Sequence, residues 1–411
     1  MQGPIISLPA FWLSMFLLIT TALCHFPSLM PRRGFTIDAV RNDKHVTNGI
    51  SAKAKAIAKF AHLVDSAKAT SLDYDPSDVL DGFVEQDDRE WLCPVKIGTP
   101  PQTVNLDLDT GSADLWVFTP NSGQKKGGLG TRAVYDPGNS STSQMINGSS
   151  WSISYGDGSY ASGNVYTDTV GVAGLNIYNA TVEVATSFSS SLVRDDAPLS
   201  GLMGLAINLT TTAHPAMPPI LRQLHSQGIG HIGVDLQYHS NGTYSFGSID
   251  HDAYTGTMKY QTVKPSKGYW WIDLTTMRVG DTNKTMIHSW DTIVDTGTSL
   301  FLAPTDIVSD YYNNIGSAIF SQEDDAYVFH CNESLPDFHF GFADNWSDFR
   351  IPGVFMNYSI APAASYPWCY GGIQESNMGF SIMGDVFLKA VYVDFNIANK
   401  SVGFAKKPLK Y

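Results

Sequence analysis

Two short segments of this chain combine a carboxylate, a hydroxyl and a glycine in the same order. The first is Asp109-Thr110-Gly111-Ser112 and the second is Asp295-Thr296-Gly297-Thr298. In each segment glycine follows the acid closely, where it permits a left-handed backbone or the close approach of a neighbour. Because similar segments recur in the two halves of the chain, the sequence indicates an internal duplication.

The chemistry of these segments depends on whether their carboxylates meet. Two aspartates held face to face cannot both ionise at ordinary pH, so the pair shares one proton. One member can then take a proton from water while the other donates a proton to a developing oxyanion. A single Asp-Thr-Gly is usually only a turn. Two copies, each at the end of an apolar run, instead favour a catalytic pair of Asp109 and Asp295.

The elements that must position this pair have the pattern of β-strands. Val104, Leu106 and Leu108 alternate with polar residues before Asp109, and an apolar pair at 293–294 precedes Asp295. Two later tracts, 202–205 and 382–385, also match each other. Each holds a glycine after an apolar pair. The duplication therefore extends beyond the two acidic turns.

A third pattern predicts a hairpin. Residues 151–155 alternate as a strand does and end in Gly156-Asp157-Gly158-Ser159, which is typical of a turn between two strands. The sequence therefore predicts a hairpin with Tyr155 beside its tip.

Length and composition limit the fold class. The chain has 411 residues and 36 glycines, and long amphipathic helical patterns are scarce. It is too long for one ordinary core and has the composition of a mainly β protein in two lobes. Its net charge is −13, and no basic cluster lies near aromatic residues after the first 86 residues, which argues against nucleic acid. The eleven histidines lack the spacing of metal ligands, so we expect no metal and no cofactor.

The charge is unevenly distributed. Residues 25–70 hold eight Lys or Arg against three Asp, a balance of +5, whereas the chain from residue 71 onward carries −18. A basic leader on an acidic body predicts a pro-segment that docks by charge.

The first 24 residues are almost entirely apolar and predict a secretory signal peptide. No Lys or Arg precedes the apolar stretch, so an uncleaved anchor is the alternative. The C-terminus lacks the apolar tail of a lipid anchor. Ten Asn-x-Ser/Thr sequons agree with passage through the secretory pathway, and they begin at Asn139, Asn147, Asn179, Asn208, Asn241, Asn283, Asn332, Asn345, Asn357 and Asn399. We expect a secreted glycoprotein that is not bound to a membrane in its mature form.

The four cysteines predict one disulfide. Cys24 lies at the end of the leader, and Cys93 is alone in an apolar strand. A bridge between Cys331 and Cys369 fits an oxidising compartment. We expect Cys93 to be a buried free thiol that packs as a small apolar residue.

These motifs resemble those of the pepsin-like aspartic peptidases, and most closely their secreted fungal branch of the penicillopepsin and aspergillopepsin type. The resemblance runs from about Trp91 to about Lys406 and includes the tracts 97–102, 109–117 and 368–374. It implies a mainly β, bilobal pepsin-like fold with two related β-lobes and a deep cleft between them. Residues 1–24 would be the signal peptide, 25–86 the pro-segment, 87–258 the N-terminal lobe and 259–411 the C-terminal lobe.

The resemblance also implies roles for single residues. Asp109 and Asp295 would activate water, Ser112 and Thr298 would hydrogen-bond their outer oxygens, and Thr110 and Thr296 would bond the backbone of the opposite loop. The hairpin would be a flap over a peptide substrate, and Trp116 would donate its indole N–H to the Tyr155 hydroxyl. The residues expected to support the dyad or contact substrate are Thr110, Gly111, Ser112, Thr296, Gly297, Thr298, Trp116, Tyr155, Gly156, Asp157 and Ser159.

The predicted pro-segment contains Ala- and Lys-rich stretches, Ala52–Ala61 and His62–Ala69, that favour short helices. In the family a pro-segment lysine lies across the two catalytic carboxylates, and Lys59 is the candidate here. The alternative is that these lysines are ordinary solvated helix charges.

The resemblance thus implies a monomeric acid endopeptidase, made as a zymogen, that cleaves proteins beside large apolar residues. The acidic Asp157 above an apolar pocket predicts that lysine is also accepted N-terminal to the cut. The alternative is that Asp157 only favours the turn. A rival function is that of a binding protein on the same fold, since some relatives have lost an aspartate. Here both aspartates, both threonines and Tyr155 are present.

Overall fold

The computed structural model describes residues 34–42, 48–64, 90–120, 129–155, 159–194, 198–264, 267–281, 286–342 and 345–411. The predicted signal peptide, residues 25–33, 43–47 and 65–86 of the predicted pro-segment, and both Gly156 and Asp157 lie outside these ranges.

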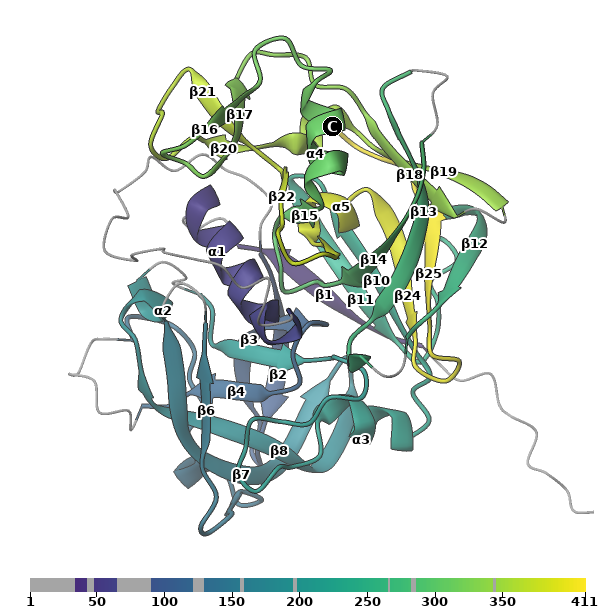
Figure 1. The fold of residues 1–411 in the computed structure, drawn as a ribbon. Coiled ribbons are helices and arrows are strands. Elements are labelled where there is room, and N and C mark those ends of the chain that lie inside the picture. The colour runs from purple at the N-terminus through teal and green to yellow at the C-terminus, as the bar shows by residue number, and fades with distance from the viewer. Residues whose placement is uncertain are drawn as a thin grey trace, which may run out of the picture. The chain divides into compact units, whose positions relative to one another are not determined.

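The described chain is mainly β, which confirms the predicted fold class (Figure 1). One hydrogen-bonded path of strands runs β12 (Thr255–Thr262), β25 (Ser401–Lys406), β24 (Val391–Asn396), β10 (His231–Gln237), β11 (Ser240–Phe246), β1 (Phe35–Arg41), β2 (Trp91–Ile97), β3 (Gln102–Asp109), β9 (Gly201–Gly204), β4 (Leu115–Phe118), β8 (Leu175–Phe188), β7 (Tyr160–Val172) and β5 (Gln144–Met145), with β6 (Trp151–Ser154) paired to β7.

Two further sheets complete the strands. The larger has the order β19 (Asn345–Ile351), β18 (Phe338–Phe342), β13 (Trp271–Val279), β14 (Met286–Val294), β23 (Ser381–Met383), β15 (Phe301–Ala303) and β22 (Ile373–Glu375). The smaller has the order β16 (Ile319–Ser321), β17 (Ala326–His330), β21 (Trp368–Gly371) and β20 (Asn357–Ile360). Residues 258 and 259, where the sequence placed the limit between the lobes, lie within β12.

The helices are short. They are α1 (Gly49–Phe60), α2 (Ser191–Arg194), α3 (Ile220–Ser226), α4 (Thr305–Tyr312) and α5 (Asp385–Leu388), with 3-10 turns η1 (Ala61–Leu63), η3 (Pro137–Asn139) and η5 (Gly353–Met356). Among the described residues, none of these is long and apolar enough to cross a bilayer.

The two strands that lead to the acidic turns are built alike. β3 pairs in parallel with β9, with Asp109 opposite Gly204, and β14 pairs in parallel with β23. A Cβ at Gly204 would lie 2.6 Å from the backbone of Ala113, and one at Gly384 would lie 2.0 Å from the Thr298 carbonyl oxygen. The matched glycines therefore stand where the later strand crosses the acidic loop, as the family resemblance implies.

Strand β1 was not predicted. It lies between β11 and β2, with Ile37 opposite Tyr244 and Val40 opposite Leu92 (Figure 1). Its residues alternate between exposed and buried, with Ile37 and Ala39 inside. That period of two is present in the sequence of Phe35–Arg41 and was the available signal.

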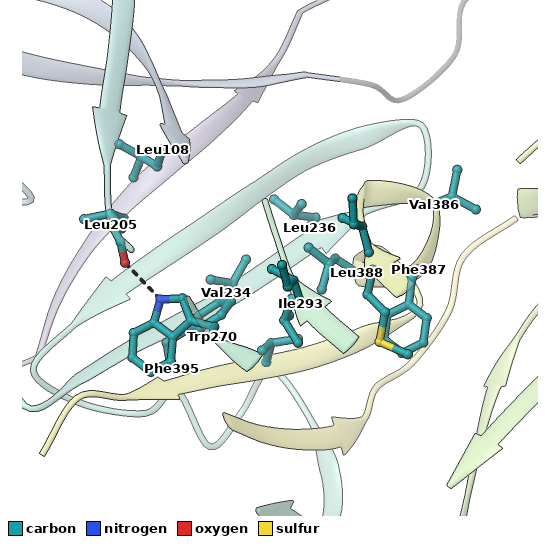
Figure 2. Packing of buried hydrophobic residues seen from close by; sticks show 14 of the residues in the cluster. Leu108, Leu205, Val234, Leu236, Trp270, Ile293, Val386, Phe387, Leu388 and Phe395 are labelled. Atoms are coloured by element: carbon teal, nitrogen blue, oxygen red, sulfur yellow. Dashed lines mark hydrogen bonds between the residues drawn. The ribbon is translucent and has the colours of Figure 1, made fainter. Parts of the chain in front are cut away.

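A continuous apolar core joins the strands of both acidic loops. Figure 2 shows Leu108, which precedes the first acid, and Ile293, from the strand of the second, in this cluster. The indole N–H of Trp270 donates to the carbonyl oxygen of Leu205 at 2.9 Å (Figure 2). This bond satisfies a polar group inside the core and joins the residue before β13 to the residue after β9.

The cysteines have the predicted states. Cys331 and Cys369 form a disulfide, and Cys93 is a free, fully buried thiol in the core cluster.

Candidate active site

The two aspartates meet at the ends of their strands. Asp109 ends β3 and Asp295 follows β14, and their exposed fractions are 1% and 0%. In each turn the glycine N–H two residues later donates to the Oδ1 atom of the acid, at 2.8 Å from Gly111 and 3.0 Å from Gly297. These charge-assisted bonds fix the orientation of both carboxyl groups.

The glycines also make room for the opposite acid. A Cβ on Gly111 would lie 2.5 Å from Asp295 Oδ1, and a Cβ on Gly297 would lie 2.2 Å from Asp109 Oδ1. Each turn is therefore packed directly against the carboxyl group of the other, and any side chain at these glycines would push the pair apart.

The two threonines lock the loops together. The backbone N–H of Thr110 donates to Thr296 Oγ1 at 3.1 Å, and the N–H of Thr296 donates to Thr110 Oγ1 at 3.0 Å. The Thr110 hydroxyl donates to the Val294 carbonyl at 3.1 Å, and the Thr296 hydroxyl donates to the Leu108 carbonyl. This reciprocal network satisfies buried polar groups and sets the spacing of the acids.

The next residue of each motif bonds its own acid. Thr298 Oγ1 donates to Asp295 Oδ2 at 2.5 Å. A hydrogen bond from the Ser112 side chain likewise stabilises the ionised form of Asp109. The structure thus brings Ser112 and Thr298 to the positions that the resemblance implied.

Lys59, at the end of α1, lies between the two acids. Its Nζ atom is 2.7 Å from Asp109 Oδ1 and 2.9 Å from Asp295 Oδ2. Burial alone would lower the pKa of Lys59, but the two carboxylates outweigh burial and raise the pKa. The lysine therefore stays protonated. Its ammonium group occupies the position between the two carboxyl groups, so neither water nor substrate can bind there at the same time.

The two acids have different pKa values. Burial raises the pKa of Asp295 and, together with the charge of the neighbouring Asp109, outweighs Lys59, which lowers it. Burial also acts on Asp109, but the Lys59 charge and hydrogen bonds from Lys59 and Ser112 outweigh it and lower its pKa. Asp109 is thus the member that ionises first, and Asp295 is the member that keeps a proton.

Residues after Lys59 also fill the site, and sequence reasoning missed them. Phe60 is fully buried, and its ring meets that of Tyr269 edge to face at a centroid distance of 5.2 Å. His62 Nε2 lies 3.0 Å from the Tyr269 hydroxyl oxygen. The alternation of apolar and charged residues along α1 could have indicated Phe60, but its partners are distant in the sequence.

The hairpin is present as predicted. β6 pairs with β7, with Ser154 opposite Tyr160, and the Tyr155 N–H donates to the Ser159 carbonyl at 2.7 Å. Trp116 Nε1 donates to the Tyr155 hydroxyl at 3.0 Å, and Ser159 is buried. Gly156 and Asp157 lie outside the described residues.

Ser200 immediately precedes the first crossing strand, β9. Ser200 is buried, and its hydroxyl accepts the Asn105 N–H at 3.0 Å, while its backbone bonds Asn105 and Phe118. A short hydroxyl therefore satisfies this junction without placing another charge behind the dyad.

The arrangement can perform acid–base chemistry on a neutral electrophile. One ionised and one protonated carboxyl, held by glycine amides and side-chain hydroxyls, can remove a proton from water and donate another to an oxyanion. In the structure the protonated Lys59 occupies the space between them.

Comparisons with known proteins agree with this geometry. A family profile described as eukaryotic aspartyl protease matches residues 90–407. The chain is 41% identical over 325 residues to endothiapepsin of Cryphonectria parasitica, which covers 78% of this chain and 76% of that protein. It is 38% identical over 399 residues to aspergillopepsin-1 of Aspergillus fumigatus, which covers 94% of this chain and 96% of that protein.

A solved structure shares the fold. The aspartic proteinase from Irpex lacteus matches with a TM-score of 0.61 and 24% identity, over 78% of this chain and 95% of that chain. At this identity the match concerns the fold alone.

Proposed function

The chain belongs to the eukaryotic aspartyl protease family and is a pepsin-like aspartic endopeptidase, and from this premise we propose that it is a secreted acid peptidase made as an inhibited zymogen. The observation that supports both the catalytic pair and its inhibition is the position of Lys59 Nζ, within 2.9 Å of both Asp109 and Asp295. A cation held between two catalytic acids excludes substrate until it leaves.

The proposed reaction uses the asymmetry of the pair. Once Lys59 has left, water binds between the acids, and its oxygen attacks the peptide carbonyl carbon while the ionised carboxylate takes its proton. The protonated carboxyl donates its proton to the carbonyl oxygen, which forms a neutral tetrahedral diol. Proton transfer to the amide nitrogen then breaks the C–N bond and leaves one carboxylic acid and one amine. The lowered pKa of Asp109 is caused mainly by Lys59 and therefore belongs to the inhibited form; in the activated enzyme the two acids share one proton as a pair.

Inhibition would depend on α1 and β1 together. α1 is capped by Asn48, whose Oδ1 accepts the Ser51 N–H at 3.2 Å, and Lys53 pairs with Asp325 at 2.8 Å. Phe60 is buried beside the lysine. These contacts hold the basic segment on the site, and acid would release it by protonating the carboxylates that it pairs with.

The test is cleavage of a denatured protein. Purified full-length chain is incubated at acid pH and at neutral pH, with and without a statine-type inhibitor, and fragments are identified by mass spectrometry. We expect cleavage only after acid treatment, and complete loss of cleavage with the inhibitor. The rival function, a binding protein on this fold, predicts no cleavage under any condition. Full activity of the precursor at neutral pH would contradict the zymogen.

Secretion, glycosylation and the monomeric state are further parts of the proposal. Exposed Asn139, at the end of η3, begins one of the ten sequons. Expression of the full chain in a eukaryotic host should give protein in the medium that lacks residues 1–24 and shifts in mass on glycosidase treatment, and light scattering should give the mass of one chain. Retention in the membrane fraction would favour the uncleaved anchor.

We also propose that the enzyme prefers large apolar residues beside the cut and that Asp157 allows lysine there. Asp157→Thr should lower kcat/KM for a lysine peptide at least about 10-fold more than for its phenylalanine counterpart, because one lost charge-assisted bond corresponds to about 1.5 kcal/mol or more. Steady-state kinetics on matched peptides measures the difference. Asp157→Ser is the control, since it removes the charge, keeps a residue that favours turns and creates no new Asn-x-Ser/Thr sequon. Equal losses on both peptides would mean that Asp157 only shapes the hairpin.

A further inference from the structure

A second pair of buried carboxyl groups lies beside the flap. Asp114 immediately precedes β4, and Glu183 lies on β8 directly opposite Trp116 in the parallel pairing of these strands. Their exposed fractions are 3% and 0%. Both Glu183 oxygens are buried beside the Asp114 carboxyl and the Ala213 N–H, and neither makes a hydrogen bond of good geometry within the described residues, while Asp114 Oδ1 accepts the Thr212 N–H at 2.6 Å.

The surroundings of this pair favour one shared proton. The charged groups that act most strongly on it are its own two carboxyls and Asp109, all of the same sign. Neighbouring elements also carry Arg132, which bonds the Val193 carbonyl, and the exposed His214. Two adjacent ionised carboxylates without water would be very costly, so one of them is protonated in the folded protein. Burial first, and then Asp114, raises the pKa of Glu183 well above its ordinary value.

The pair is linked to the flap through a loop. Thr212 and Ala213, whose amides face the two carboxyls, are followed by His214, which forms an isolated bridge with Ser150. The His214 N–H donates to the Ser150 carbonyl at 2.7 Å, and the Ser150 N–H donates back at 3.1 Å. Ser150 is the residue before β6, the strand that ends beside Tyr155.

A second link passes through Trp116. Its backbone lies in register with Glu183, its ring stacks on Trp151 of β6 at a centroid distance of 6.0 Å, and its Nε1 bonds the Tyr155 hydroxyl at 3.0 Å. The carboxyl pair therefore underlies both attachments of the flap strand, at its beginning and at its end.

We propose that the proton shared by Asp114 and Glu183 positions the flap, and that its loss at higher pH releases the loop around Ala213 and with it the strand that carries Tyr155. Asp114 and Glu183 are positioning residues that act through Trp116 and Ser150. The upper pH limit of an ordered flap is then set by this pair and not by the catalytic dyad.

The direction of the pH effect follows from linkage. A raised carboxyl pKa means that the folded protein keeps a proton that the unfolded chain loses above the ordinary Glu value of 4.5. The stabilising contribution of the pair is therefore full below that pH and declines as pH rises toward the folded-state pKa. This is opposite to the behaviour of a salt-bridged acid.

The test compares Glu183→Gln with the unmodified full chain by hydrogen exchange between pH 4 and 8. Gln has nearly the same shape as Glu and can donate a proton in a hydrogen bond to Asp114, but it cannot ionise. In the unmodified chain we expect the protection factors of Ser150, Tyr155 and Ala213 amides to fall at least about 10-fold as pH rises, which corresponds to one pKa unit of differential proton binding. In Glu183→Gln this fall should disappear. Asp114→Asn keeps an acceptor for the Thr212 N–H and should also lose the pH-dependent fall in protection. It replaces Glu183→Gln in the test if that variant does not fold.

The matched control is Glu375→Gln in β22. Burial raises the pKa of Glu375 as well, but Glu375 lies in a different sheet from β6. This variant should therefore leave the pH-dependent change in the protection of Ser150 and Tyr155 unaltered. An unchanged transition in both Glu183→Gln and Asp114→Asn would overturn the proposal.

Peptidase kinetics supply a second readout, which rests on the proposed function. After acid activation, the upper limb of the pH profile of kcat/KM should move to higher pH in Glu183→Gln, while the lower limb, set by the dyad, stays in place. Loss of the exchange transition in a protein without peptidase activity would contradict the proposed function and leave the role of the pair supported.

Discussion

Asp109→Asn and Asp295→Asn should each lower kcat/KM at acid pH by about 10³-fold, because each removes one partner of a proton transfer that typically contributes 10²–10⁴-fold. An asparagine keeps an oxygen that can accept the glycine N–H, at Gly111 or Gly297, so the fold should persist. Activated enzyme is measured on a chromogenic peptide, and circular dichroism checks the fold.

The control for these variants is Asp252→Asn, which makes the same change at an exposed turn residue. It should retain the activity of the unmodified enzyme. If either dyad variant kept a tenth of the activity or more, the shared-proton mechanism would be wrong.

Lys59→Gln should release inhibition at higher pH than the unmodified zymogen and about 100-fold faster at an intermediate pH. Removing one partner of a buried ion pair typically costs about 3–5 kcal/mol of binding free energy. A loss of about 3 kcal/mol would accelerate release by the expected ~100-fold. Because Lys59 lowers the pKa of Asp109, the contact contributes to docking above the ordinary carboxyl pKa and is lost as pH falls through the lowered value. Without Lys59 this acid requirement is relaxed.

The release rate is measured by inhibitor-sensitive cleavage after a pH jump. Lys55→Gln is the matched control, because it removes the same charge from the same helix, α1. If Lys59→Gln and Lys55→Gln accelerated release equally, general charge attraction would explain docking, and the contact with the dyad would contribute nothing specific. Raising salt should accelerate release in all three proteins, since it screens the attraction of the basic segment for the acidic body.

The parts of the site that the sequence predicted are local. The Asp-Thr-Gly motif can be identified from four consecutive residues, and the second copy in the chain supports the interpretation of the first. The Thr110–Thr296 network was predicted only through the family resemblance, because nothing in either segment identifies the other as its partner.

The parts that it did not predict depend on pairing over long distances. The alternation in β1 indicates a strand but not that β11 and β2 are its neighbours. Glu183 reads as one polar residue in a strand, and only the parallel register with β4 brings it to Asp114. Likewise Phe60 is one apolar residue of a helix until Tyr269 is placed against it.

Strand β1 has a consequence for the lifetime of the mature enzyme. It belongs to the segment that we expect to be cleaved, yet it hydrogen-bonds both β11 and β2 inside a single sheet. Its departure leaves two facing strand edges with unpaired amides and carbonyls, which are templates for association with other chains. Because we propose a monomeric mature enzyme, we expect the residues immediately before Trp91 to pair with these edges in place of β1. A mature molecule that unfolds after this step lacks the strand that joined its two halves and therefore cannot refold by the same route. The lifetime of its activity is then set by the rate of unfolding.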